Sequence, residues 1–190
     1  AKMIGGRMRV LFDTPYAGFA QGIEEDTEAI RIFMEEGVPV AVALSFSKIG
    51  GLYDFRTGAL FIPTASREAT IELQRVANSK QRVITSSTSA LGQRIMDEVM
   101  SDPSLSTQWG NDLQQAAEMI ANRRDIFAKV VPEFKFVAEQ SGLFSVLPLN
   151  KGQIGRLMTE KAVYMAEVTQ QDGEVHARAN FGVTTSKMKR

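Results

Sequence analysis

The chain has 190 residues, of which 44% are hydrophobic and 23% charged, as in an ordinary globular protein. Its 22 basic and 22 acidic residues cancel, so no charge excess suggests a nucleic-acid or membrane surface. The absence of cysteine and the single histidine, His176, exclude disulfides and thiol catalysis and argue against a histidine-based metal site. No transmembrane helix or signal peptide is predicted, and the cysteine-free composition fits a cytoplasmic enzyme.

The first predicted elements form a β-α-β unit. A short strand over Arg7–Phe12 ends at Asp13, a helix follows, and the unbroken apolar run over residues 38–44 predicts a buried parallel strand. Such crossovers are right-handed, so both strands end at the same edge of the sheet. We therefore expect Asp13 and Lys48 to be neighbours in space.

The segment after the second strand concentrates polar side chains. Ser45 and Ser47 offer hydroxyls, Lys48 offers an amine, and Arg56 adds a planar cation eight residues later. In open α/β sheets, ligands bind at the carboxyl ends of such strands. An amine between hydroxyls and a guanidinium suits a phosphorylated aldehyde, with the lysine as Schiff base and the others on the phosphate. The alternative is a solvated strand-to-helix loop with incidental charges.

Further strands and helices follow. A strand is predicted over residues 57–62, helices over 66–77 and 89–100, and an irregular, hydroxyl-rich connector over 80–89. A helix from Pro103 to about Val131 is the longest element; at 1.5 Å per residue it spans roughly 40 Å. That length suits a connection between two domains.

Beyond Pro132 the pattern predicts a small α+β unit. Its predicted elements are strands over residues 134–138 and 143–146, a helix over 150–161, and strands over 163–168 and 174–181. The last two strands flank Asp172-Gly173, and such an Asp-Gly pair is a strong hairpin signal.

Several motifs share their order and spacing with one enzyme family. They are Asp13-Thr14-Pro15-Tyr16, Gly18-Phe19, the run over residues 22–26, Ser45-Phe46-Ser47-Lys48, Leu52-Tyr53 and Arg56. In these the chain resembles the aspartate and aromatic amino acid aminotransferases, which are pyridoxal-phosphate-dependent enzymes of the type I fold. The resemblance runs through nearly all 190 residues and covers about the second half of a family member.

The resemblance implies a fold and a division of the chain. The fold is α/β: part of the mixed, mostly parallel sheet of a type I large domain, followed by a small α+β C-terminal domain. Residues 1–102 would be the second half of the cofactor-binding large domain, residues 103–131 a long connecting helix, and residues 132–190 the truncated small domain.

The resemblance also implies roles around the cofactor, pyridoxal 5'-phosphate. Lys48 would hold the cofactor aldehyde as a Schiff base and then shuttle a proton. Asp13 would pair with the pyridine nitrogen and keep it protonated, and Tyr16 would bond the ring hydroxylate. Ser45, Ser47 and Arg56 would bind the phosphate.

Three further residues match substrate-binding positions of the family. Phe144, in Gly142-Leu143-Phe144-Ser145, matches a segment near the substrate. Arg178 matches the arginine that binds the substrate α-carboxylate, a role that suits a bidentate guanidinium. Arg82 lines up with an arginine that reaches a neighbouring subunit's site and receives a dicarboxylate side chain. Ala177 stands where the family usually has a glycine.

The sequence thus predicts a fragment of an aminotransferase acting on dicarboxylic or aromatic amino acids with 2-oxoglutarate. Its partners would be amino and 2-oxo acids, and a second copy in a homodimer or the missing N-terminal half. The family's phosphate loop and ring-stacking aromatic lie in that half. We therefore expect the chain to be inactive alone and the apolar faces of its strands to be partly bare.

Two other functions remain open at this point. The chain could belong to another type I fold enzyme, a lyase or a decarboxylase, since these share the aspartate, lysine and arginine positions. It could also be a catalytically silent fragment that serves only in folding or oligomerisation. Such a fragment would give no visible absorbance when pyridoxal phosphate is added.

Overall fold

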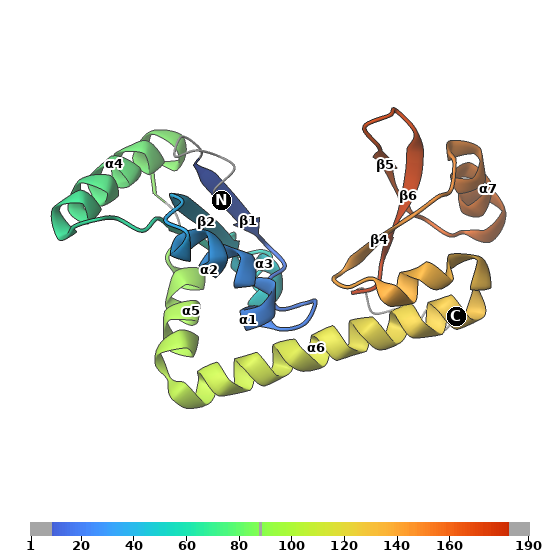
Figure 1. Cartoon of the computed structure of the whole chain (residues 1–190), viewed down its shortest axis with the longest axis horizontal. Coiled ribbons are helices and arrows are strands. Elements are labelled where there is room, and N and C mark those ends of the chain that lie inside the picture. Colours follow the sequence, from blue (N-terminus) through green and yellow to red (C-terminus); the bar gives the residue numbers. More distant parts are fainter. Residues whose placement is uncertain (1–8, 88, 183–190) are drawn as a thin grey trace. The chain divides into compact units, whose positions relative to one another are not determined.

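A computed structural model describes residues 9–87 and 89–182. These residues divide into two compact units (Figure 1). Residues 9–18 and 22–113 form the first unit, and residues 19–21 and 114–182 form the second. No helix in the described ranges is long and apolar enough to cross a membrane.

The first unit contains a mixed three-stranded sheet in the order β1-β2-β3. Strand β1 (Val10–Thr14) pairs in parallel with β2 (Val40–Ser45), and β3 (Gly58–Phe61) pairs antiparallel with β2. The predicted parallel pairing of the first two strands is confirmed. Arg7 and Met8, which belong to the predicted first strand, lie outside the described residues.

The crossover between β1 and β2 contains two short helices, α1 (Ile23–Asp26) and α2 (Glu28–Glu35). Phe33 of α2 packs edge-on against Phe12 of β1, with ring centroids 5.5 Å apart. This contact holds α2 on the sheet, so the predicted β-α-β unit is confirmed.

The apolar surface of this sheet is only partly covered. Leu11 of β1 is 64% exposed and Leu60 of β3 is 59% exposed. Within the described residues, the expectation that the strands would be left partly bare is confirmed.

The other helices of this unit are α3 (Phe46–Ile49), α4 (Arg67–Thr85) and α5 (Leu91–Ser101). The predicted irregular connector over residues 80–89 is wrong as far as Thr85, because α4 continues through it. Lysine, glutamine and arginine are good helix formers, and the Thr85 hydroxyl donates to the Gln81 carbonyl at 3.1 Å in the last turn of the helix.

Helix α6 (Pro103–Val130) confirms the predicted long helix. It begins where the Asp102 carboxylate accepts hydrogen bonds from the amides of Ser104 and Leu105, at 2.7 and 3.0 Å. Proline suits the first turn because it lacks an amide proton there. The first part of this helix belongs to the first unit, and the part from Gln114 onward belongs to the second.

The second unit contains an antiparallel sheet in the order β4-β6-β5. Its strands are β4 (Phe144–Leu147), β5 (Ala166–Thr169) and β6 (Val175–Asn180). Helix α7 (Lys151–Lys161) follows β4 and starts with a capping box between Asn150 and Gln153. The predicted hairpin of the last two strands is confirmed.

The predicted strand over residues 134–138 is wrong. Pro132–Glu139 instead forms a 3₁₀ segment, η2. Phe134, Phe136 and Val137 all pack against the buried core, and the Phe134 ring stacks on Phe127 of α6 at 6.1 Å. An alternating strand would turn one of two neighbouring residues outward, so packing both Phe136 and Val137 inward requires a helical turn.

Candidate functional site

The short helix α3 presents Lys48 at the carboxyl end of β2. Ser45 ends the strand and caps the helix, because its hydroxyl oxygen accepts a hydrogen bond from the Ser47 amide at 3.3 Å. Phe46 and Ile49 point into the interior and are buried, whereas Lys48 is exposed. The apolar residues on either side therefore fix the turn that holds the lysine outward.

A tyrosine ring joins the two predicted cations. The Lys48 Nζ lies 4.2 Å from the centre of the Tyr53 ring, and the Arg56 guanidinium carbon lies 5.5 Å from the same centre. The chain reverses direction at Gly51, which has a φ of 64°. The contact between Tyr53 and Lys48 could not be predicted from the sequence, because it depends on this turn and not on a regular spacing along a helix or strand.

Arg56 itself has an unusual backbone conformation. Its φ is 51°, in the left-handed region that side-chain-bearing residues rarely adopt. One of its guanidinium nitrogens, Nη1, donates to the Tyr53 carbonyl at 3.4 Å. The guanidinium is thus held beside the ring that Lys48 also contacts.

Asp13 lies on the strand adjacent to the one that leads to Lys48. It is opposite Ala43 in the parallel pairing, two residues before Ser45. The next residue, Thr14, donates its hydroxyl to the Ala43 carbonyl at 3.1 Å. The exposed carboxylate near the end of β1 and the lysine just after β2 thus belong to neighbouring parallel strands. That the two side chains lie close together stays a prediction.

The loop after Asp13 carries Tyr16, which is half-buried. The Gly18 amide donates to the Asp26 carboxylate at 2.7 Å, which closes this loop onto α1. Gly18 has a φ of 91°, and a Cβ there would come within 2.5 Å of Leu113 on α6. Only glycine fits this position without displacing a neighbour.

Trp109 of α6 is bonded to the end of α3, the short helix that carries Lys48. Its indole nitrogen donates to the carbonyl of Ile49 at 2.7 Å, next to Lys48. The sequence did not reveal this bond, because Trp109 and Ile49 are 60 residues apart.

In the second unit the structure brings Arg178 and Phe144 together. The Arg178 guanidinium carbon lies 4.6 Å from the centre of the Phe144 ring. Phe144 is opposite Asn180 in the sheet, so Arg178 is its diagonal neighbour on the same face. Ala177 points to the other face and is fully buried in the core. Alternation along β6 therefore keeps Arg178 exposed.

A cavity of about 660 Å³ adjoins this pair. Arg178 and Phe144 line it together with mostly apolar side chains from α6 and from the segment between α7 and β5, including Phe127, Tyr164 and Met165. Its one cationic side chain is surrounded by mostly apolar ones, and such a cavity suits a small molecule that carries a carboxylate.

Arg82 lies apart from these groupings. It is exposed in the last turn of α4, and its carbonyl accepts from the Ser86 amide at 3.0 Å. Within the described ranges, no hydrogen bond or ring contact links its side chain to the other predicted site residues.

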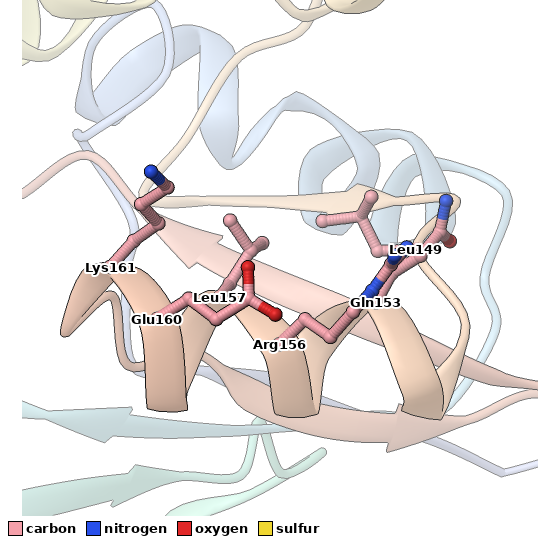
Figure 2. A pocket seen from close by; sticks show the side chains of 6 residues that line it. All are labelled: Leu149, Gln153, Arg156, Leu157, Glu160 and Lys161. Atoms are coloured by element: carbon pink, nitrogen blue, oxygen red, sulfur yellow. The ribbon is translucent and has the colours of Figure 1, made fainter.

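A smaller hollow of about 270 Å³ lies along α7 (Figure 2). Leu149 and five residues of the helix line it, Gln153, Arg156, Leu157, Glu160 and Lys161. The Gln153 side chain is already bound to the Asn150 amide at 2.9 Å as part of the helix cap. None of the predicted site residues lies here.

Comparison with known proteins identifies the family. A sequence model of "Aminotransferase class I and II" matches residues 5–190. The aspartate aminotransferase of Pseudomonas aeruginosa is 35% identical over 161 residues, a match covering 80% of this chain and 40% of that protein. That of Escherichia coli is 33% identical over 160 residues, covering 81% and 40%.

Solved structures agree. The aromatic-amino-acid aminotransferase of Burkholderia pseudomallei, covalently bound to pyridoxal phosphate, matches 94% of this chain and 45% of its own with a TM-score of 0.82 and 28% identity. The aromatic amino acid aminotransferase of Psychrobacter, crystallised with aspartic acid, matches 93% and 44% with a TM-score of 0.80 and 30% identity. The chain spans about 40% of the length of the curated relatives it matches. Its mixed α/β fold is that of these proteins, and the chain belongs to the class I and II aminotransferase family.

Proposed function

We propose that the chain carries the lysine-bearing part of a pyridoxal-phosphate-dependent aminotransferase. The reaction would transfer an amino group between a dicarboxylic or aromatic amino acid and 2-oxoglutarate. The observation that carries this proposal is the grouping of Lys48 and Arg56 on one ring, Tyr53, at the end of a strand whose parallel neighbour carries Asp13.

These residues fit the cofactor chemically. An exposed amine can bind its aldehyde, a guanidinium and two hydroxyls can bind its phosphate, and a carboxylate on the next strand can pair with its pyridine nitrogen. When bound, pyridoxal phosphate supplies an electron sink for the carbanion formed at the substrate Cα.

Each residue of the chain then has a defined task. The Lys48 amine would hold the cofactor by its aldehyde and would move a proton to and from the substrate Cα. Asp13 would hold a proton on the pyridine nitrogen through its negative charge, and Tyr16 would donate to the ring oxygen. Ser45, Ser47 and Arg56 would anchor the phosphate. Arg178 would receive the substrate α-carboxylate, with Phe144 beside it near the substrate, and Arg82 would receive a side-chain carboxylate at a neighbouring subunit.

The remaining expectations belong to the same proposal. Residues 1–102 would form part of the large cofactor-binding domain, residues 103–131 the connecting helix, and residues 132–190 the small domain. The complete enzyme would be a homodimer. A cytoplasmic location is supported by the absence of cysteine.

The test of this function is the fate of the amino group. The protein containing this chain should form glutamate from 2-oxoglutarate with aspartate or phenylalanine as donor, and only when pyridoxal phosphate is present. Coupled detection of glutamate measures it. Release of carbon dioxide from the amino acid, with no glutamate formed, would instead identify a decarboxylase.

Arg178→Lys should raise KM for every amino acid tested, whatever its side chain. Lysine keeps the charge but loses the two-pronged geometry that suits a carboxylate. A hydrogen bond to a charged group is worth about 1.5–3 kcal/mol, so the increase should be roughly 10- to 100-fold. Steady-state kinetics with aspartate and phenylalanine measure it.

Arg156→Lys, an exposed arginine of α7 in the same unit, is the matched control and should leave KM unchanged. If Arg178→Lys affects one class of amino acid only, Arg178 contacts the side chain and not the α-carboxylate.

A further inference from the structure

A second arginine, Arg124, binds the segment that carries Phe144, from the core side of the sheet. Arg124, about two turns before the end of α6, is only 1% exposed. Its guanidinium is fixed to one short segment: Nε and Nη2 donate to the Gly142 carbonyl at 3.2 and 2.5 Å, and Nη2 also contacts the carbonyls of Ser141 at 3.3 Å and Phe144 at 2.8 Å. Nη1 donates to the Ser145 hydroxyl. One side chain thus binds four of the five residues from 141 to 145.

Burying a charged guanidinium costs free energy of folding, so stability alone does not explain Arg124. Burial removes water from the guanidinium and lowers the pKa of Arg124, although the group stays charged at neutral pH. The partners found among the described residues are neutral oxygens and the face of the Phe181 ring, 4.7 Å away. Replacing a buried charge by apolar residues is often neutral or stabilising, so the guanidinium has a clear use only if the segment it binds must be held in one conformation.

The segment connects Arg124 to Arg178 through the strand β4. Side chains alternate along a strand, and Ser145 faces the core, where it meets Arg124 and is 3% exposed. Phe144 faces the other way and carries the Arg178 guanidinium on its ring. The backbone that Arg124 holds is therefore the backbone from which Phe144 projects.

Resting on the proposed function, in which Arg178 binds the substrate carboxylate, we propose that Arg124 is a positioning residue for substrate binding. By fixing the carbonyls of Ser141, Gly142 and Phe144 it sets the position of the Phe144 ring, and that ring orients the guanidinium of Arg178. Arg124 touches neither substrate nor cofactor in this scheme.

The test compares Arg124→Gln with Arg123→Gln in the protein containing this chain. Arg123 is the next residue on the helix, and its Nη1 donates to the Phe181 carbonyl at 3.0 Å, outside the 141–145 segment. Arg124→Gln should raise KM for both aspartate and phenylalanine by roughly 5- to 20-fold with kcat within about twofold, the pattern of lost uniform binding. Arg123→Gln should leave both constants unchanged. Hydrogen exchange at the amides of residues 141–145 should accelerate only in Arg124→Gln.

A purely structural role gives a different pattern. Arg124→Gln would then lower the thermal unfolding temperature while KM of the folded fraction stays that of the parent protein, and this result would overturn the proposal. Equal effects of the two arginine variants on KM would overturn it as well.

A third variant decides the case if Arg124→Gln does not fold. Phe144→Leu changes a partly exposed ring and leaves the Arg124 contacts in place. It should raise KM for both substrates, and adding Arg124→Lys to it should raise KM no further, because both changes act through the same ring. An unchanged KM in Phe144→Leu contradicts the proposal whatever happens at Arg124.

The experiment also separates this proposal from the function on which it rests. Succinate is a dicarboxylate that cannot react, and calorimetry gives its dissociation constant without turnover. If no amino transfer occurs but succinate binds several-fold more weakly to Arg124→Gln than to Arg123→Gln, the positioning role stands and the proposed reaction fails. If transfer occurs and succinate binds both variants equally, the positioning role fails alone.

Discussion

Replacing Lys48 by alanine should lower amino-group transfer by about 10⁴-fold in the protein that contains this chain. In the proposed function the lysine is both the amine that binds the cofactor and the base that moves the substrate proton, and a positioned acid-base group alone contributes typically 10²–10⁴-fold. Lys48→Arg should be nearly as inactive, because a guanidinium keeps its proton at neutral pH. Initial rates of glutamate formation measure both variants.

Chemical labelling tests the same residue without turnover. Borohydride reduction of the protein with pyridoxal phosphate should attach the cofactor to the peptide that contains Lys48. Lys80 and Lys151 are exposed lysines on other helices and serve as internal controls. A label found on either of these in place of Lys48 would show that the assignment is wrong.

Asp13→Ala should lower transfer by two to three powers of ten. An ion pair about 4 Å long contributes about 4 kcal/mol at an effective dielectric constant of 20, and every 1.36 kcal/mol is a factor of ten in rate. Asp13→Asn should lose almost as much, because an amide keeps the shape and hydrogen-bonding capacity of the side chain but not its charge. Single-turnover rates with aspartate measure both.

The control for Asp13 is Asp26. Its carboxylate accepts from the Gly18 amide in the loop that follows Asp13, so Asp26→Ala should lower stability and change the rate much less. If Asp13→Ala reduces the rate by less than about threefold, Asp13 only caps a turn.

The sequence predicted those parts of the fold that depend on local patterns. The parallel pairing of β1 and β2, the long helix α6 and the hairpin of β5 and β6 each follow from a period, a cap or a turn residue, and each is confirmed. Of the two errors, one misjudged a local preference and the other overlooked packing. Hydroxyl-bearing residues suggested a loop where α4 continues, and β-prone aromatic residues suggested a strand where η2 packs its side chains inward.

The candidate site divides in the same way. That Asp13 and Lys48 belong to neighbouring parallel strands could be predicted, because a β-α-β unit places both strand ends at one edge of the sheet. Tyr53, Trp109 and Arg124 could not, since their contacts depend on a turn or on partners far along the chain. Arg124 and Ser145 are 21 residues apart, and no spacing rule links them.

The backbone of Arg56 has a consequence for any attempt to make this protein more heat-resistant. A left-handed conformation costs a residue with a Cβ about 1–2 kcal/mol, and glycine avoids most of that cost. Ala162, which ends α7 at a φ of 53°, is in the same situation but carries no guanidinium. Under laboratory selection for thermal survival alone, glycine would be favoured at both positions. Under selection for catalysis it would persist only at 162, so residue 56 is where the two selections diverge.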